Sequence, residues 1–226
     1  MGFIDDLINF VNEEQKKNTS YHAYDEQDLF TLSGKAQFSV LDFWRYRYAQ
    51  LAGLHAEIAE FIVALALGIS KSENVNYWTA YDMSYQGHRI EVKESSYVHP
   101  WNKTRVSSVR NFSIAPSNNA YWNKAFDPNT NEKTARQSEI YVFCLNTNQD
   151  PQNLQPLNLD LWEFYVVPTY RINQMAIANN NPNQKTISLN VIKKLAGKPC
   201  HYDALRGVID LALADVDQYF VCNQKE

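Results

Sequence analysis

The feature that most constrains the fold of this chain is a pair of extended segments joined by a two-residue turn. Residues 77–85 read YWTAYDMSY and are rich in aromatic side chains, while residues 88–98 read HRIEVKESSYV. The second segment alternates apolar and charged residues, as a strand with two different faces does. Gln86-Gly87 between the segments suits a tight turn. The sequence therefore predicts a β-hairpin, to which the rest of the chain must add further strands.

A helical pattern precedes this hairpin. From Ser39 to about Leu67 the chain contains no proline and only Gly53 as a weak point, and Ala, Leu, Glu and Ile dominate the second half. Asp42 lies three residues after Ser39, where a capping box usually has Glu or Gln. Gly68 suits a C-terminal cap. We therefore predict one long helix, with Gly53 as the point at which it could bend.

The remaining patterns complete an α/β domain. The continuous apolar run IYVFCL at residues 140–145 is typical of a buried strand. The order helix, hairpin, strands, helices predicts a central mixed β-sheet flanked by helices. The other expected segments are a short helix at 3–11, strands at 105–115 and 162–169, loops at 12–35, 116–136 and 173–185, and helices at 189–196 and 203–220.

Composition limits the partners and the compartment. The net charge of −4 argues against a nucleic-acid partner, yet residues 86–136 carry eight Lys/Arg and four Asp/Glu. This basic stretch either contacts a polyanion or forms solvated loops. The longest apolar run, residues 61–69, is too short to cross a bilayer, and the first residues do not resemble a signal peptide. Three scattered cysteines suggest neither disulfides nor a zinc site. We expect a cytoplasmic protein without a membrane partner.

Three charged residues of the hairpin are expected to converge. Asp82 lies at the start of the first strand, and Glu91 and Lys93 share one face of the second. Two partly buried carboxylates repel each other and lose hydration, and Mg²⁺ or Mn²⁺ relieves both penalties. The backbone carbonyl of Val92 is a further candidate oxygen ligand. A lysine beside such a metal would orient the attacking water and offset charge during phosphodiester hydrolysis.

This pattern resembles the PD-(D/E)XK nuclease superfamily, which includes many type II restriction endonucleases. The family places a glutamate on a helix, an aspartate on a strand and Glu-x-Lys on the next strand of an αβββαβ core. Here the order is a helix with Glu57 and Glu60, then Asp82, then Glu91-Val92-Lys93. The resemblance covers residues 50–115 and, more loosely, 140–145. Tyr81 replaces the family's proline, which shapes the backbone and binds no metal.

The resemblance implies a role for each matching residue. It makes Lys93 the catalytic lysine and Glu60 the helical acid, with Glu57 as the alternative. It also implies a single restriction-endonuclease-like domain over residues 1–226, with an N-terminal helix and loop at 1–36, a catalytic core at 37–170 and C-terminal helices at 186–221. The implied metal ligands are Asp82, Glu91, Glu60 and the Val92 carbonyl.

Polar and aromatic residues after the Glu-x-Lys strand are candidates for nucleic-acid contact. Hydroxyl, amide and cationic groups bind phosphates and base edges, and aromatic rings stack on bases. An alternative is a polar loop whose aromatic residues are anchored in the core. The candidates are Ser95, Tyr97, Trp101, Asn102, Lys103, Arg105, Asn118 and Tyr121.

The resulting hypothesis is a Mg²⁺-dependent endonuclease that hydrolyses DNA in restriction, defence or repair. Double-stranded DNA is the expected partner, and a homodimer is possible. One alternative is a catalytically inactive relative that binds DNA or a protein. A second is an unrelated α/β protein, which is distinguished by whether Asp82, Glu91 and Lys93 converge in the structure.

Overall fold

The computed structural model describes residues 26–48, 54–69, 81–99, 106, 110–117 and 135–223. The chain divides into two compact units, residues 1–49 and 50–226, and the single domain predicted over 1–226 includes both. The predicted helix at 3–11 and residues 118–134 of the predicted excursion lie outside the described residues.

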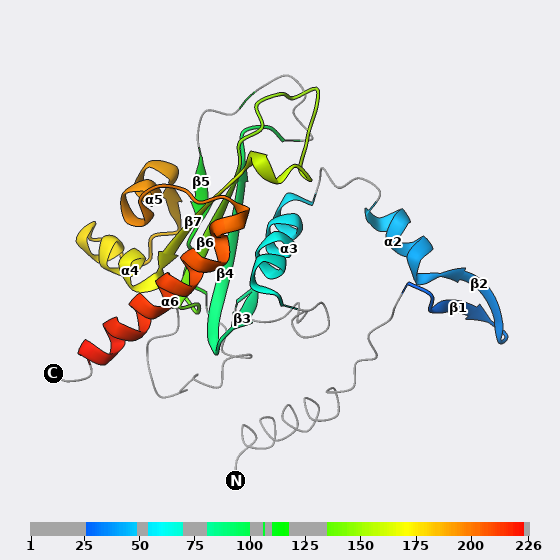
Figure 1. Ribbon diagram of the computed structural model, residues 1–226, viewed down its shortest axis with the longest axis horizontal. Helices are drawn as coiled ribbons and strands as arrows, with labels where there is room; N and C mark the ends of the chain where they lie inside the picture. The colour runs from blue at the N-terminus through cyan, green and yellow to red at the C-terminus, as the bar shows by residue number, and fades with distance from the viewer. Residues whose placement is uncertain are drawn as a thin grey trace, which may run out of the picture. The chain divides into compact units, whose positions relative to one another are not determined.

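The first unit contains a hairpin of strands β1 (Leu29–Leu32) and β2 (Lys35–Ser39), followed by helix α2 (Val40–Tyr48) (Figure 1). The two turn residues, Ser33 and Gly34, both have positive φ, 51° and 74°. Such a turn matches the twist of paired strands. The loop predicted for residues 12–35 is therefore wrong from residue 29 onwards, because this Ser-Gly turn lets the flanking residues pair.

The predicted helix start at Ser39 is confirmed, and the predicted length of that helix is wrong. The Ser39 N–H donates to Asp42 Oδ2 at 2.9 Å, and the Asp42 N–H donates to Ser39 Oγ at 3.1 Å, as in a capping box. However, α2 ends at Tyr48, and Leu54 has non-helical φ −113° and ψ 36° as the N-cap of helix α3 (His55–Leu67). Leu54 directly follows Gly53, which is the weak point of the predicted helix because glycine is a poor helix former.

The second unit is built on a mixed four-stranded sheet, in the order β3-β4-β6-β7. Strands β4 and β6 are parallel, and the other two pairs are antiparallel. The predicted α/β class with a mixed central sheet flanked by helices is thus confirmed. The strands are β3 (Met83–Tyr85), β4 (His88–Ser96), β6 (Ile140–Asn146) and β7 (Trp162–Pro168), and a separate pair is formed by β5 (Asn111–Ser113) and β8 (Thr186–Ser188).

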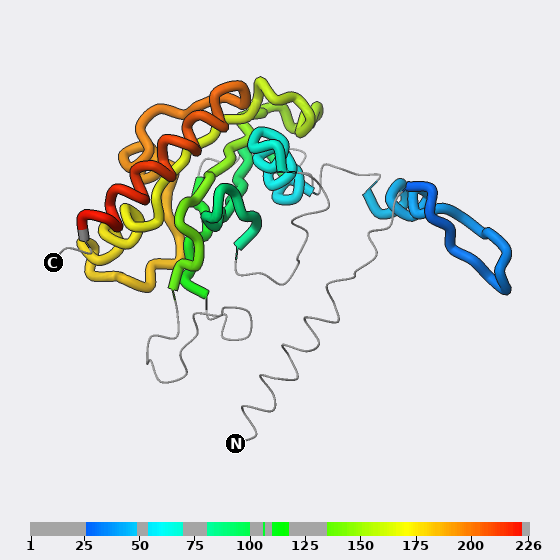
Figure 2. The backbone as a smooth tube through the Cα atoms, turned by 60° about the horizontal axis from the view of Figure 1, so that its bottom comes forward, coloured from blue at the N-terminus to red at the C-terminus, as the bar shows by residue number. Residues whose placement is uncertain are grey.

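Helices cover both faces of the central sheet (Figures 1 and 2). Helix α3 and the C-terminal helix α6 (Tyr202–Asn223) bury apolar residues against one face, together with Ile90 and Val92 of β4. Helices α4 (Thr169–Ala178) and α5 (Leu189–Ala196), with β5 and β8, pack on the other face. Because side chains alternate along β4, its odd-numbered residues from 89 to 95 do not point into the core that Ile90 and Val92 share with α3 and α6.

Several predicted elements of this unit are confirmed. The hairpin turn at Gln86-Gly87 has positive φ at both positions, 51° and 83°, and Gly68 caps α3 with φ 72°. The strands at 140–145 and 162–169 and both C-terminal helices are present. The loop predicted at 173–185 is wrong for residues 173–178, which belong to α4, where Ile172 and Ala176 are buried one turn apart. None of the described helices is long and apolar enough to cross a membrane.

Candidate active site

Asp82 and Glu91 lie opposite each other at the open end of the hairpin. Met83 pairs with Ile90 in the antiparallel register, so the residue before Met83 faces the residue after Ile90. The Asp82 N–H donates to the Ile90 carbonyl at 3.1 Å, and the Val92 N–H donates to Asp82 Oδ2 at 2.6 Å. The first bond extends the strand pairing by one residue, and the second fixes the carboxylate against β4.

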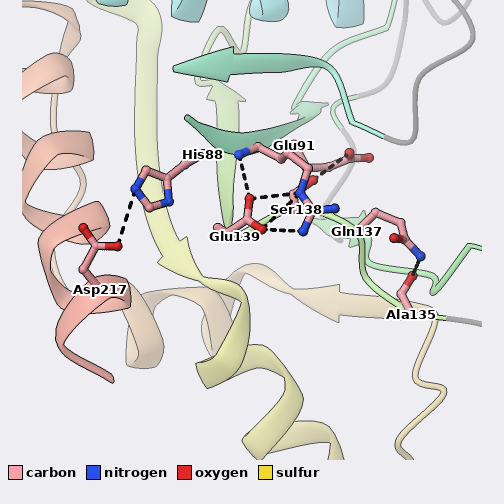
Figure 3. Close-up of polar contacts among 8 residues, drawn as sticks. His88, Glu91, Ala135, Gln137, Ser138, Glu139 and Asp217 are labelled. Carbon is pink, nitrogen blue, oxygen red and sulfur yellow. Dashed lines mark hydrogen bonds and ion pairs between the residues drawn. The ribbon is translucent and has the colours of Figure 1, made fainter. Parts of the chain in front are cut away.

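Lys93 completes the group on the same face of β4. Its ammonium group forms an ion pair with Glu91 Oε1, and the two side chains are only 28% and 17% exposed. The other oxygen of Glu91 accepts a hydrogen bond from the Ser138 hydroxyl at 3.4 Å (Figure 3). Ser138 itself is buried, just before β6. The structure thus brings Asp82, Glu91 and Lys93 together.

Glu60 adds a third carboxylate to this group from helix α3. Its carboxyl is partly buried, and burial together with the nearby Asp82 carboxylate raises its pKa from 4.5 to about 7. Lys93 opposes this increase, while Glu57 and Glu91 add to it. Glu57, in the first turn of the same helix, is exposed. Of the two helical glutamates, Glu60 therefore interacts with the hairpin residues.

The electrostatics of the group are those of crowded carboxylates. Burial raises the pKa of Asp82 above its ordinary value, against the opposing effects of Lys93 and the Val92 N–H. Burial and the Asp82 carboxylate likewise raise the pKa of Glu91. Burial alone would lower the pKa of Lys93, but Glu91, Asp82 and Glu60 together raise it. Lys93 is thus the one cation that interacts with all three acids. An additional cation would further reduce the repulsion between their carboxylates.

The donor chemistry of this group fits a hard divalent cation. Carboxylate oxygens are the ligands that Mg²⁺ and Mn²⁺ prefer, and repulsion between partly buried carboxylates is the penalty that a cation relieves. Within the described parts of the chain, no three His, Cys, Asp or Glu side chains are already grouped as a metal site. Lys93 pairs with Glu91 in this arrangement, so the lysine and the carboxylates would have to adjust around a cation. Ligation by the Val92 carbonyl stays a prediction.

Two contacts hold the start of β4. Arg89 and Glu139 form an ion pair with several hydrogen bonds, among them Arg89 N–H to Glu139 Oε2 at 2.6 Å and Arg89 Nε to Glu139 Oε1 at 3.0 Å. His88 contacts Asp217 of α6, with 3.5 Å between Nε2 and Oδ1 (Figure 3). The first contact ties β4 to the residue next to Ser138, which keeps Ser138 within reach of Glu91.

A second polar cluster, which sequence reasoning missed, lies on the face of β4 that packs against α3. His55 Nδ1 lies 2.7 Å from Ser96 Oγ and 3.4 Å from Glu94 Oε1, and Ser96 also bonds to Glu94. His55 Nε2 is buried and has no hydrogen-bond partner among the described residues. The sequence did contain a signal for this cluster. Glu94 and Ser96 lie on the same face of β4 as the buried Ile90 and Val92, and yet both are polar. This cluster fixes the start of α3, the helix that carries Glu60.

Each basic residue of the 86–136 stretch that the structure describes contacts other residues of the same chain. Arg89 and Lys93 pair with acids, and the Arg110 guanidinium lies 3.6 Å from the centre of the Tyr97 ring. Arg136 donates to the Ile114 carbonyl at 2.8 Å and to the Gln184 carbonyl at 2.7 Å. These four residues form internal contacts and offer no evident row of cations to a polyanion. Its other basic residues, Lys103, Arg105, Lys124 and Lys133, lie outside the described residues.

Of the residues predicted to contact nucleic acid, only Ser95 and Tyr97 lie within the described part of the chain. Ser95 is half-buried on the same face of β4 as Lys93. Tyr97 packs against the core beside α4 and α5, and Arg110 covers one face of its ring, which leaves that face closed to a base. The other candidates, Trp101, Asn102, Lys103, Arg105, Asn118 and Tyr121, lie outside the described residues.

Comparison with models of known protein families, with curated proteins and with solved structures gives no match to this chain. The features of the chain that indicate a function are therefore Glu60, Asp82, Glu91 and Lys93.

Proposed function

We propose that this protein is a divalent-metal-dependent nuclease that hydrolyses phosphodiester bonds of DNA on a restriction-endonuclease-like αβββαβ core. The observation that carries the proposal is that Asp82, Glu91 and Lys93 lie together at the end of a hairpin, while Glu60 of α3 is near enough for these charges to influence its pKa. Acids in that setting have raised pKa values. Perturbed acids gathered around a cation are typical of catalytic sites. The order of these residues along the chain is that of the PD-(D/E)XK pattern.

Each residue has a distinct task in the proposal. Glu60, Asp82 and Glu91 would hold Mg²⁺ or Mn²⁺ through their carboxylate oxygens. The bound cation would polarise the scissile phosphate and lower the pKa of the attacking water. Lys93, released from its pair with Glu91, would donate hydrogen bonds to a phosphate oxygen and stabilise negative charge that develops during hydrolysis. Arg89 and Glu139 would keep β4 aligned with Ser138.

A second candidate function is binding without catalysis, by an inactive relative of the same fold. Two observations favour it. Lys93 pairs directly with Glu91, and the described arginines of the basic stretch make internal contacts. A module of this kind would bind DNA or a protein and leave phosphodiester bonds intact.

Cleavage of supercoiled plasmid separates the two candidates. Wild-type protein should nick plasmid with Mg²⁺ or Mn²⁺ and should lose activity in EDTA. Glu60→Gln should lose most of this activity, whereas Glu57→Gln, on the exposed side of the same helix, should retain it. Equal activity of the two variants would contradict the assignment of Glu60. A wild-type protein that binds DNA and never cuts it, over a broad set of DNA and RNA substrates, would favour the second candidate.

A further inference from the structure

His55 and Asn146, both in the second unit, each have a buried polar atom without a hydrogen-bond partner in the part of the chain that the structure describes. The two atoms are His55 Nε2 and Asn146 Nδ2. Asn146 is only 2% exposed, and the His55 side chain is 11% exposed. Because buried polar groups are nearly always hydrogen-bonded, both atoms indicate a further binding partner.

The fold brings these two residues to the same place. Asn146 is the last residue of β6, and Ser96, the last residue of β4, is its partner in the parallel register. Both side chains lie on the face of the sheet that α3 covers, because Ile90 and Cys144 in the same rows belong to the core that includes α3. His55, the first residue of α3, contacts Ser96, with 2.7 Å between Nδ1 and Oγ. His55 and Asn146 therefore meet at the carboxyl ends of two parallel strands, where open α/β sheets bind ligands.

The contacts of His55 Nδ1 determine what His55 Nε2 can do. Ser96 donates its one hydroxyl hydrogen to the Glu94 carboxylate, which can only accept. The contact between Ser96 Oγ and His55 Nδ1 therefore needs a hydrogen on Nδ1, and Glu94 Oε1, 3.4 Å from the same nitrogen, favours this tautomer too. In a neutral imidazole ring with its hydrogen on Nδ1, Nε2 is an acceptor. The cluster thus has one unused acceptor.

The side-chain amide of Asn146 has one unused donor. The Asn148 N–H donates to Asn146 Oδ1 at 3.0 Å, and this bond identifies which end of the amide is oxygen. The other end, Nδ2, can only donate. A carboxylate only accepts and an ammonium group only donates, so neither satisfies both unused atoms, and the Glu94 carboxylate repels an anion. A hydroxyl group donates and accepts, and it is uncharged.

We propose that His55 Nε2 and Asn146 Nδ2 together bind one hydroxyl group, which donates its hydrogen to His55 and accepts one from Asn146. The hydroxyl belongs either to a water molecule or to a small uncharged alcohol. From this hydroxyl a chain of hydrogen bonds runs through His55 and Ser96 to the Glu94 carboxylate, and bonds in such a chain strengthen one another. The inference does not depend on the proposed nuclease activity, because none of these residues is a proposed metal ligand.

Nuclear magnetic resonance spectra of the full chain test the proposal. Long-range ¹H–¹⁵N spectra show which nitrogen of His55 carries the hydrogen, and rotating-frame Overhauser spectra show which hydrogens lie close to the Asn146 side-chain amide. We expect hydrogen on Nδ1 and a cross-peak between the Asn146 amide and a hydroxyl. A cross-peak to water identifies water as the source. Cross-peaks to the C–H hydrogens of added glycerol, used as the probe, identify a site for an alcohol.

A variant at His55 tests whether both residues hold the hydroxyl. His55→Phe keeps an aromatic ring and removes the acceptor, so the cross-peak at the Asn146 amide should be lost. The matched control His201→Phe changes another histidine of the same unit, whose Nδ1 lies 3.2 Å from the Trp162 carbonyl oxygen, and should retain the cross-peak.

Three results would each overturn the proposal. They are a wild-type His55 with its hydrogen on Nε2 alone, a wild-type Asn146 amide without a cross-peak to any hydroxyl or to glycerol, and a cross-peak that persists in His55→Phe. If circular dichroism shows that His55→Phe is unfolded, the two wild-type measurements decide by the same criteria.

Discussion

Replacing Glu60 with glutamine should stabilise the metal-free protein, and only at neutral and higher pH. The carboxyl of Glu60 has a pKa of about 7 in the folded protein and an ordinary value of 4.5. A carboxyl with a raised pKa favours the fold while it is protonated, so its contribution is fully present below pH 4.5 and is lost as the pH rises through about 7. A glutamine side chain at this position is neutral at every pH, so the variant should avoid this loss.

The size of the effect follows from the shift. One pKa unit corresponds to about 1.4 kcal/mol, so a shift from 4.5 to about 7 sets an upper limit of about 3.4 kcal/mol. Because Glu60 is partly exposed, solvent screening reduces the expected gain to about 1–2 kcal/mol. For a chain of this size such a gain raises the melting temperature by about 2–8 °C.

Thermal melts in EDTA at pH 5 and pH 8.5 measure this difference. Relative to wild type, Glu60→Gln should melt higher at pH 8.5 and nearly the same at pH 5. The matched control Glu57→Gln changes an exposed glutamate of the same helix and should show no such pH-dependent gain. Addition of Mg²⁺ should raise the melting temperature of wild type more than that of Glu60→Gln, since the variant lacks one ligand. A Glu60→Gln protein that is less stable than wild type at pH 8.5 in EDTA would refute the electrostatic reasoning.

Three further predictions address the neighbouring residues. Lys93→Ala should abolish plasmid cleavage while circular dichroism shows an intact fold, because its proposed task is in the transition state; full activity would exclude a catalytic role for this strand. Asp82→Ala should lose saturable Mn²⁺ binding in calorimetry, and binding equal to wild type would exclude Asp82 as a ligand. His55→Ala should lower the free energy of unfolding by about 2–3 kcal/mol, since it leaves the half-buried Glu94 and the buried Ser96 with fewer partners; urea denaturation measures this loss, and a change below about 0.5 kcal/mol would show that the contact is not stabilising.

The central strands could be predicted from the sequence because their patterns are local. The alternation along HRIEVK identifies a two-faced strand, and the continuous apolar run at 140–145 identifies a strand buried on both faces. The turn at Gln86-Gly87 is likewise a local signal. Together these patterns also placed Asp82 opposite Glu91, since a two-residue turn fixes the register of a hairpin.

Long-range contacts explain most of what the sequence could not reveal. Arg89 and Glu139 are fifty residues apart, and only the parallel pairing of β4 with β6 brings them together. Glu57 and Glu60 are three residues apart, so both lie on one side of a helix by spacing alone. Which of them approaches Asp82 depends on how α3 is rotated against the sheet. The buried residues Ile58, Ile62 and Val63 set that rotation.

The chemical character of the hairpin end argues for a function beyond folding. Asp82, Glu91 and Lys93 lie partly buried at one end of the hairpin, and burial raises the pKa of Asp82, Glu91 and the nearby Glu60. Well-packed apolar side chains would often be as stable or more stable in such a position, because charged groups lose hydration on burial. Ser138 and the Arg89–Glu139 pair hold the strand that carries these charges, and the His55 cluster holds the helix that carries Glu60. This cost, together with the supporting contacts, is why we propose a binding or catalytic use for the charges. A divalent cation is the ligand that removes the repulsion most directly.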